Sequence, residues 1–370
     1  MDGYRYGPAR IDVEANDPGA VRWLREFLIP WFEACPPGAS DFSVRLTVSA
    51  PAFHALERQQ AAAMVHPRAC FCLDSQLVEL PSWTDAEGTV IADARLGCCY
   101  RLRPGSVEIV ARPGSPRLRI GLMRVVRELA ALRMLGEVGC LDLHAAAFAV
   151  KDRAILLVGP KGAGKTTLLV SALGSGRASL LANDRVFVET DQDPRRAFGV
   201  PTLVSIRPDT LERFPVLRSS VPGGTSLLHA AEIEAHAAGG SGDATPGKFS
   251  LSPAQLAEQL GAGSLPCAPI AAIVFPEIFP KQSGWSLTPV APQEAGARLR
   301  ENLYGARLGP RTTTVFEEIV DGRPPHRREP AEQVDRLARS LPAFACRLGP
   351  DAYRDGADAW LRALPLEPVP

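Results

Sequence analysis

The sequence is poor in several features that mark particular classes of protein. Lys+Arg and Asp+Glu both number 41, so the formal net charge is zero, and aromatic residues make up only 6%. A chain with neither a positive excess nor many aromatic side chains offers little to attract or stack nucleic acid. No stretch approaches the ~18 consecutive apolar residues of a membrane-spanning helix. We therefore expect neither a nucleic-acid partner nor a membrane partner.

The amino terminus also lacks the marks of export. MDGYRYGPAR has no basic stretch followed by an apolar run, which is the pattern of a signal peptide. We therefore expect a cytoplasmic protein whose eight cysteines form no disulfide framework. Cys70, Cys72, Cys98 and Cys99 have C-x-C and C-C spacings, whereas a zinc site usually has C-x2-C pairs. We interpret these four as small buried residues of strands.

Lysine is scarce in this chain. Only five of the 41 basic residues are lysines, and they are Lys151, Lys161, Lys165, Lys248 and Lys281. Three of the five fall within fifteen residues. A chain that otherwise uses arginine tends to keep lysine where a compact point charge is needed, so the cluster indicates a functional segment.

Composition and periodicity divide the chain into three parts. Residues 1–115 predict a mixed α+β domain with one early helix, roughly Ala20 to Ala34, and several half-buried strands. Residues 116–140 predict a connecting helix, because apolar residues recur at helical spacing with arginines on the other face. Residues 141–370 predict a second domain with a long, flexible surface segment near 218–248.

The second domain reads as an α/β fold. Two apolar strands at 143–150 and 154–159 precede a Gly-rich turn, and a helix follows from Lys165 to about Leu173. Further strands are expected at 178–182, 186–190, 202–206 and 268–278, with a last helix at about 358–364. This order predicts a ligand at the carboxyl ends of the strands.

The Gly-rich turn carries the clearest motif. GPKGAGKT matches G-x-x-x-x-G-K-[ST] in full and lies between an apolar strand and a buried helix. Its glycines let backbone N–H groups form an anion-binding nest, and the helix start adds partial positive charge. The predicted nucleotide-binding residues are Gly159, Pro160, Lys161, Gly162, Ala163, Gly164, Lys165, Thr166 and Thr167. The alternative is a strand-to-helix turn that binds no nucleotide.

The motif predicts ATP and Mg²⁺ as ligands, and it assigns roles to two residues. Lys165 would reach the β- and γ-phosphates, and the Thr166 hydroxyl would be a magnesium ligand. A transfer reaction also needs a base for the acceptor. Asp184, after the next strand, could accept a hydroxyl proton or hold magnesium through a water, although Asn-Asp can also be a simple turn.

Two more residues are weaker candidates. His144 lies in an apolar strand that should neighbour the P-loop strand, where a histidine is more often structural than catalytic. Glu277 ends the apolar strand AAIVFPE and resembles an acid that orients water or magnesium in ATPases, but it could equally be a surface residue. Nothing in the spacing alone decides between these alternatives.

At these residues the chain resembles the HPr kinase/phosphorylase group, whose P-loop fold is shared with phosphoenolpyruvate carboxykinase. The shared features are a histidine in LHAAA (His144), the loop GPKGAGKTT, and Asn-Asp-Arg at 183–185 where the group has an acidic pair followed by Arg. The chain is most similar to HPr-kinase-like proteins encoded with peptide natural-product genes, including those that phosphorylate lasso-peptide precursors. The resemblance covers roughly residues 117–365, and its specific motifs lie within 143–186.

The resemblance implies an ATP- and Mg²⁺-dependent kinase acting on a Ser or Thr of a peptide or protein. It implies Asp184 as the catalytic base, His144 as its support, Lys165 at the phosphates and Arg185 helping to hold phosphate charge. Thr166 and Asp184 are the implied metal ligands. Homo-oligomerisation stays open.

The chain departs from the pattern at two positions, and three functions stay open. Asn183 replaces the first acid of the pair, and Lys161 stands where the group usually has Ser. If the missing acid were the base, the chain would be a nucleotide-binding pseudokinase or regulatory protein. If Asp184 is the base, activity survives and Asn183 orients its neighbour. The third possibility is an ATP hydrolase in which Glu277 positions water.

Overall fold

The computed structural model describes most of the chain as two compact units. The described residues are 1–71, 77–115, 117–206, 208–214, 216–217, 249–279, 281–304, 319, 330–354, 357–364 and 366. One unit contains Met1–Val138 and Ile319, and the other contains the remaining described residues. The segment expected to be flexible, 218–248, lies outside the described residues. Both units are mixed α/β structures built on a large mixed sheet.

The sheet of the first unit has the strand order β3-β1-β2-β4-β9-β8-β7-β6-β5 among the described residues. Strands β2, β4 and β9 pair in parallel, and the other neighbours pair antiparallel. The strands are β1 (Asp2–Tyr6), β2 (Ala9–Ala15), β3 (Glu33–Cys35), β4 (Phe42–Val48), β5 (His66–Phe71), β6 (Leu77–Asp85), β7 (Gly88–Asp93), β8 (Cys98–Arg103) and β9 (Ser106–Ala111). Buried and exposed residues alternate along β4, as expected for a strand with one face in the core.

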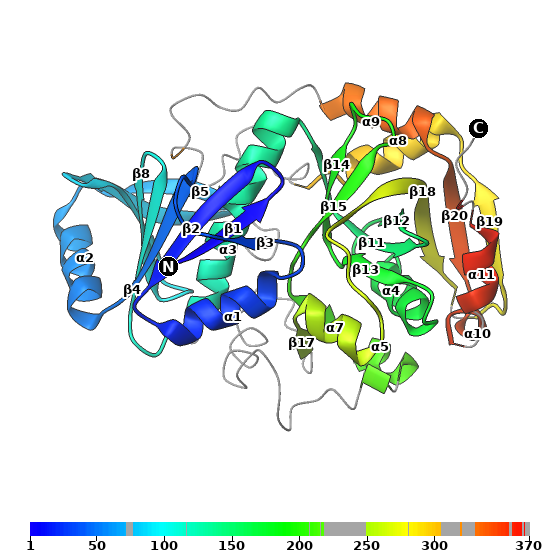
Figure 1. Ribbon diagram of the computed structural model, residues 1–370, viewed down its shortest axis with the longest axis horizontal. Helices are drawn as coiled ribbons and strands as arrows, with labels where there is room; N and C mark the ends of the chain where they lie inside the picture. The colour runs from blue at the N-terminus through cyan, green and yellow to red at the C-terminus, as the bar shows by residue number, and fades with distance from the viewer. Residues whose placement is uncertain are drawn as a thin grey trace. The chain divides into compact units, whose positions relative to one another are not determined.

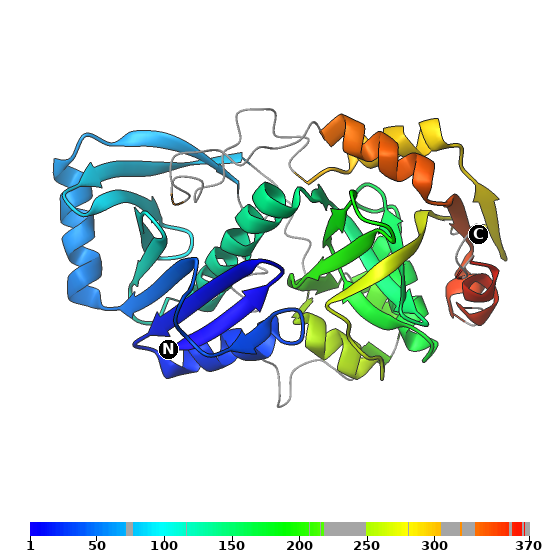
Figure 2. The same ribbon diagram turned by 45° about the horizontal axis from the view of Figure 1, so that its top comes forward.

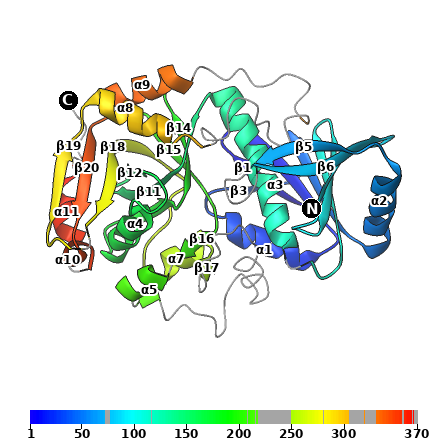
Figure 3. The same ribbon diagram turned by 180° about the vertical axis from the view of Figure 1, so that it is seen from behind.

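Among the described residues, three helices pack on this sheet. Helices α1 (Pro18–Leu28) and α3 (Leu118–Arg133) pack together and against β2, and Figure 3 shows α3 lying across the strands. Helix α2 (Ala50–Ala62) begins at the N-cap Ser49 and covers Trp83 with Phe53 and Leu56. Because α1 and α3 pack on the strands around β2 and α2 packs on β8 and β9, helices contact both faces of the sheet, while residues such as Arg45 on β4 stay exposed.

The early helix is shorter than the sequence predicted, and helix α2 was not predicted. Helix α1 ends at Leu28, Ile29 is extended, and the residues expected to continue the helix instead include strand β3. Pro30 explains the early end, because proline disfavours helical backbone in the residue before it. The expected connecting helix is α3, which belongs to the first unit and is followed by a π-helical turn at Met134–Val138.

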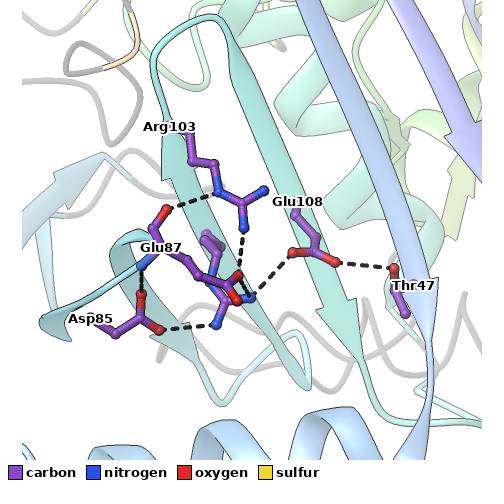
Figure 4. Close-up of polar contacts among 6 residues, drawn as sticks. Thr47, Asp85, Glu87, Arg103 and Glu108 are labelled. Atoms are coloured by element: carbon purple, nitrogen blue, oxygen red, sulfur yellow. Dashed lines mark hydrogen bonds and ion pairs between the residues drawn. The ribbon is translucent and has the colours of Figure 1, made fainter.

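The α2 face of this sheet also carries a network of charges. Arg101 lies 3.0 Å from a carboxylate oxygen of Asp85, 3.0 Å from Glu87 and 3.3 Å from Glu108. Figure 4 shows these carboxylates gathered over neighbouring strands, with Arg103 also paired to Glu87. The Arg101 side chain is only 12% exposed, so its charge is satisfied by several acids at once.

The sheet of the second unit follows the order β10-β14-β15-β18-β12-β11-β13, with β20 pairing β18 and β19 pairing β20. Its strands are β10 (Leu141–Leu143), β11 (Ala145–Val150), β12 (Arg153–Val158), β13 (Ser179–Ala182), β14 (Arg185–Glu189), β15 (Arg196–Val200), β18 (Cys267–Ile278), β19 (Trp285–Pro289) and β20 (Ala343–Leu348). Strand β12 pairs in parallel with β18 and antiparallel with β11. The predicted strands of this region are present within one or two residues of the expected ends.

Helices cover both faces of the second sheet. Helices α4 (Lys165–Gly174), α10 (Pro350–Arg354) and α11 (Ala357–Ala363) contact one another, and Trp360 of α11 packs edge-on against Phe148 of β11 (Figure 1). Helices α8 (Pro292–Glu301) and α9 (Pro330–Ser340) form a pair that supplies Leu299 and Leu337 to the core on the other face (Figure 2). The P-loop strand is therefore buried on both sides.

A small two-stranded sheet completes the second unit. Strand β16 (Val204–Ile206) pairs antiparallel with β17 (Phe249–Leu251). Helices α5 (Pro208–Arg213) and α7 (Pro253–Gln259) follow these strands in the chain, and α7 begins at a capping box formed by Ser252 and Gln255.

Candidate nucleotide-binding and transfer site

The P-loop sequence lies between a buried strand and a helix, as its motif requires. Strand β12 ends at Val158, and α4 begins at Lys165 after a left-handed N-cap residue, Gly164. Gly162 and Gly164 have φ angles of +91° and +108°. A Cβ on Gly164 would lie 2.4 Å from Cγ1 of Ile278, so this position needs glycine for its conformation and for its space.

The loop presents its motif residues to different surroundings. Pro160 and Lys161 are exposed, Thr166 is half-buried in the first turn of α4, and Thr167 is buried. The start of α4 supplies backbone N–H groups and partial positive charge, which favour an anion at this end of the helix. Its ten residues are enough to sustain that effect.

Lys165 is buried at the centre of the site. Its Nζ donates to the carbonyl oxygens of Gly159 (2.6 Å) and Pro160 (3.3 Å), and it lies 3.0 Å from Nε2 of His144. Only 7% of the residue is exposed. The ammonium group therefore lies inside the P-loop, where the motif predicts phosphate oxygens.

His144 sits at a break between two strands. Strand β10 ends at Leu143, β11 begins at Ala145, and Ala145 pairs with Val158, the last residue before the P-loop. His144 therefore lies beside the start of the loop. Its backbone N–H donates to the carbonyl of Asn302 at 2.8 Å, which fixes the chain at the break.

Asp184 sits at a second break, directly beside the first. Strands β13 and β14 meet at residues 183–184, β13 pairs with β11, and β14 pairs with β10. An Oδ1 atom of Asp184 lies 3.4 Å from Nδ1 of His144. The Asp184 side chain is 46% exposed, so a substrate can reach its carboxylate.

The contacts of His144 indicate which ring nitrogen carries its proton. A lysine ammonium donates and cannot accept, so Nε2 of His144 must accept from Lys165. A neutral imidazole then carries its proton on Nδ1, the nitrogen that faces Asp184. Lys165, His144 and Asp184 thus form a line of three polar groups at the edge of the sheet where β12 ends.

Asn183 points away from this line. Its Oδ1 accepts from the Thr202 hydroxyl at 3.0 Å, and its Nδ2 donates to the carbonyl of Leu203 at 3.3 Å. The residue is 8% exposed. The amide uses a donor and an acceptor at once, and an ionised carboxylate has only acceptors.

Arg185 is buried rather than open to the loop. Its Nε and Nη2 donate to the two carboxylate oxygens of Asp142 at 3.0 and 2.8 Å. The guanidinium carbon lies 4.3 Å from the ring centre of Tyr304 and 5.2 Å from that of Phe187. The resemblance implied that Arg185 helps to hold phosphate charge, whereas in the structure its guanidinium forms a bidentate pair with Asp142 and lies over two aromatic rings.

Glu277 lies at the same end of the sheet but on its other face. Its neighbours Pro276 and Ile278 face Gly159 and Gly164 of the loop, so Glu277 faces the α8 side. Its carboxylate lies 3.0 Å from Nε of Arg347 and 3.6 Å from Nη1 of Arg298.

The contact partners of the site could not be predicted from motifs. Asp142, Thr202, Asn302 and Tyr304 belong to no recognisable pattern, and the chain brings them together only by folding. Asp142 lies 43 positions from Arg185 in sequence. The one sequence feature that could have drawn attention to Asp142 is its place two residues before His144.

Comparison with known proteins adds no family to these observations. No protein-family model matches the chain, and a search of curated proteins finds no significant match. Within the described ranges, no group of three or more His, Cys, Asp or Glu side chains is arranged to hold a metal ion. No helix in the described part of the chain is both long and apolar enough to cross a membrane.

Proposed function

We propose that this chain is an ATP- and Mg²⁺-dependent phosphotransferase that phosphorylates a Ser or Thr hydroxyl of a peptide or protein. The observation that carries the proposal is the line Lys165–His144–Asp184, which begins inside a P-loop and ends at a solvent-accessible carboxylate. A phosphate-binding lysine and a proton acceptor are the two groups that phosphoryl transfer to a hydroxyl requires.

The residues at the loop suit a magnesium nucleotide. Mg²⁺ prefers oxygen ligands and usually keeps waters and phosphate oxygens beside one or two protein groups. Thr166 and Asp184 supply a hydroxyl and a carboxylate that are each partly exposed. When bound, the ion neutralises charge that develops on the phosphates. Lys165 and the backbone N–H groups from Lys161 to Thr166 would hold the phosphates themselves.

Asp184 is the proposed base, and His144 holds it in place. The acceptor oxygen bonds to the γ-phosphorus as the bond to the β-phosphate oxygen breaks, which releases ADP. The hydroxyl proton moves to the Asp184 carboxylate. The Nδ1–H of His144 faces that carboxylate and keeps it oriented, and Lys165 fixes the imidazole from its other side.

The type of kinase fold, the acceptor and the cellular location form part of the same proposal. The second unit would be a P-loop kinase core of the HPr kinase/phosphoenolpyruvate carboxykinase type. The support is the motif order of His144, the P-loop and Asp184, on strands that meet at one edge. The similarity to kinases of peptide natural-product clusters suggests a precursor peptide as the acceptor and the cytoplasm as the location.

The test is label transfer from γ-labelled ATP. Purified protein is incubated with Mg²⁺ and with peptides encoded beside its gene, and Lys165→Ala and Asp184→Asn are assayed in parallel. We expect label on a peptide hydroxyl, with transfer lost in both variants and ATP binding retained in Asp184→Asn. Transfer that survives Asp184→Asn would exclude Asp184 as the base.

A nucleotide-binding protein without transfer activity is the second candidate. Asn183 favours it, because this residue replaces the first acid of the related motif. The buried contacts of Asn183 with Thr202 and Leu203 favour transfer instead, since they give the amide a structural use. Hydrolysis directed by Glu277 has less support, because its carboxylate is paired with Arg298 and Arg347 on the face opposite α4.

A further inference from the structure

Arg185 has surroundings that a phosphate ligand would not need. It is 2% exposed, it forms a bidentate pair with Asp142, and its guanidinium lies over the rings of Tyr304 and Phe187. A buried bidentate pair, with aromatic rings against the guanidinium, fixes the guanidinium plane in one orientation. We call Asp142, Arg185 and Tyr304 the arginine clamp.

The clamp joins the chain segments that carry the site. Arg185 directly follows Asp184, and Asp142 lies two residues before His144. Tyr304 donates its backbone N–H to the carbonyl of Asp142 at 2.7 Å. Each member of the clamp is therefore within two residues of His144 or Asp184, or is bonded to such a residue.

Backbone contacts also join the segment 302–304 to the segment that carries His144. His144 donates its backbone N–H to Asn302, Leu143 pairs with Leu303, and Tyr304 bonds back to Asp142. The segment 302–304 therefore runs antiparallel to 142–144. Moving Asp142 relative to Arg185 would therefore shift His144 relative to Asp184. The strand interruptions that carry these two residues would no longer lie side by side.

We propose that Arg185 is a positioning residue, which acts through the arginine clamp to hold His144 against Asp184 and Lys165. This inference rests on the proposed phosphotransfer function. Asp142 and Tyr304 share the role, so the three residues form a unit. A shift of about 1 Å at reacting groups can cost about 100-fold in rate, which sets the size of the expected effect.

The kinetic test compares Arg185→Lys, Asp142→Asn and the double variant. We expect kcat to fall by about 100-fold in each single variant, with the dissociation constant for ATP changed less than about twofold. The double variant should be no slower than the worse single variant, because residues that act as a unit are not additive. If Arg185 instead bound phosphate directly, Arg185→Lys would weaken ATP binding tenfold or more, and Asp142→Asn would not. That result, or an unchanged kcat in either single variant, would overturn the proposal.

A second readout does not depend on catalysis. Nitrogen-15 NMR of the histidine side chains, assigned with His144→Ala, reports which ring nitrogen of His144 carries the proton. We expect the proton on Nδ1 in the wild type and a mixture of tautomers in Arg185→Lys and Asp142→Asn. An unchanged His144 spectrum in both variants would refute the clamp. If the wild type transfers no phosphate, the proposed function fails while this spectrum still decides the clamp.

Matched controls separate positioning from loss of folding. Arg95 also makes a bidentate pair, with Asp93 in the first unit, although its side chain is 40% exposed, so Arg95→Lys removes a pair of the same hydrogen-bond pattern and should leave kcat and the His144 spectrum unchanged. Thermal unfolding is measured for every variant. If either charge variant is unfolded at the assay temperature, Tyr304→Leu replaces it, because it keeps both charges and removes the aromatic ring above Arg185. A tenfold or larger loss of kcat in Tyr304→Leu supports the clamp, and a smaller change contradicts it.

Discussion

Gly164 shows how one missing side chain permits the loop to close. Its φ angle of +108° is costly for other residues, and a Cβ would lie 2.4 Å from Ile278. Gly162 has a similar φ of +91° but no atom within 4 Å of a Cβ at its position. Substituting Gly162 therefore tests backbone strain alone, whereas substituting Gly164 tests strain together with steric overlap.

We predict that Gly164→Ala unfolds more easily than Gly162→Ala and loses ATP binding. Left-handed backbone costs both variants about 1–2 kcal/mol, and overpacking adds about 1–3 kcal/mol to Gly164→Ala alone. Urea denaturation and ATP titration measure the two effects. The double change Gly164→Ala with Ile278→Ala should recover part of the binding, because it removes the overlapping side chain. Equal losses in the two single variants would contradict the steric explanation.

Buried thiols predict how the protein responds to alkali. Burial raises the pKa of Cys98, Cys99 and Cys346 to about 12. Because the unfolded chain releases these protons near pH 8.5, stability should fall as the pH rises above that value. The free energy of unfolding, measured by denaturant between pH 7 and pH 10, checks the direction. A rise in stability over that range would contradict it.

The same burial predicts which thiols react. We expect iodoacetamide at pH 8 to modify Cys35 and Cys267, which are partly exposed, before the buried Cys98 and Cys99. Mass spectrometry of the native protein locates the modified residues. The sequence had predicted that Cys70, Cys72, Cys98 and Cys99 are buried strand residues. Cys98 and Cys99 are buried in β8, and Cys70 lies in β5. Cys72 lies outside the described residues.

At the scale of elements, Asn183 links a strand junction to the chain that leads into β16. The amide bonds Thr202 and Leu203, just before Val204 begins that strand. We predict that Asn183→Asp destabilises the protein by about 1–3 kcal/mol, because a carboxylate cannot donate to the Leu203 carbonyl. It should not increase the rate of transfer.

Asn16→Asp is the matched control for this prediction. Asn16 likewise donates to a carbonyl and accepts one hydrogen bond, here from the N–H of Val48, whose carbonyl it also bonds, but it does so at an exposed position. Its replacement should cost less, since water can solvate the new charge. Denaturant melts compare the two variants, and label transfer is measured alongside. A faster transfer in Asn183→Asp would show that the missing acid is the base after all.

Local signals predicted the elements around the P-loop better than those of the first unit. Strands β12 and β13 and helix α4 follow from apolar runs and the motif. Helix α2 was missed, although Ser49 followed two residues later by Pro51 is a helix-start signal. The clamp around Arg185 was beyond prediction, because its pairing with Asp142 depends on two strands lying side by side. The resemblance had implied that Arg185 helps to hold phosphate charge.

The whole molecule contains two units, each with its own sheet and covering helices. The P-loop, His144 and Asp184 all belong to the second unit. We predict that calorimetry resolves two unfolding transitions, and that Mg-ATP raises the temperature of the second unit's transition. Ligand at 100 times its dissociation constant stabilises the binding unit by about 2.7 kcal/mol.

Lys165→Ala serves as the control for this whole-molecule prediction. In this variant Mg-ATP should leave both transitions where they are, because the phosphate-binding charge is lost. A single transition that Mg-ATP shifts in the wild type would show that the two units unfold as one. Mg-ATP that shifts neither transition in the wild type would contradict nucleotide binding by the second unit.

The break at His144 has a consequence for deuterium labelling. Its amide proton is held by Asn302, outside the ladder of the neighbouring strands, so its protection depends on the segment 302–304 staying in place. Amide groups within β11 and β12 are protected by the strands themselves. The rate at which this one proton is replaced by deuterium therefore reports how often the segment 302–304 leaves the histidine, and it can be followed before any substrate is known.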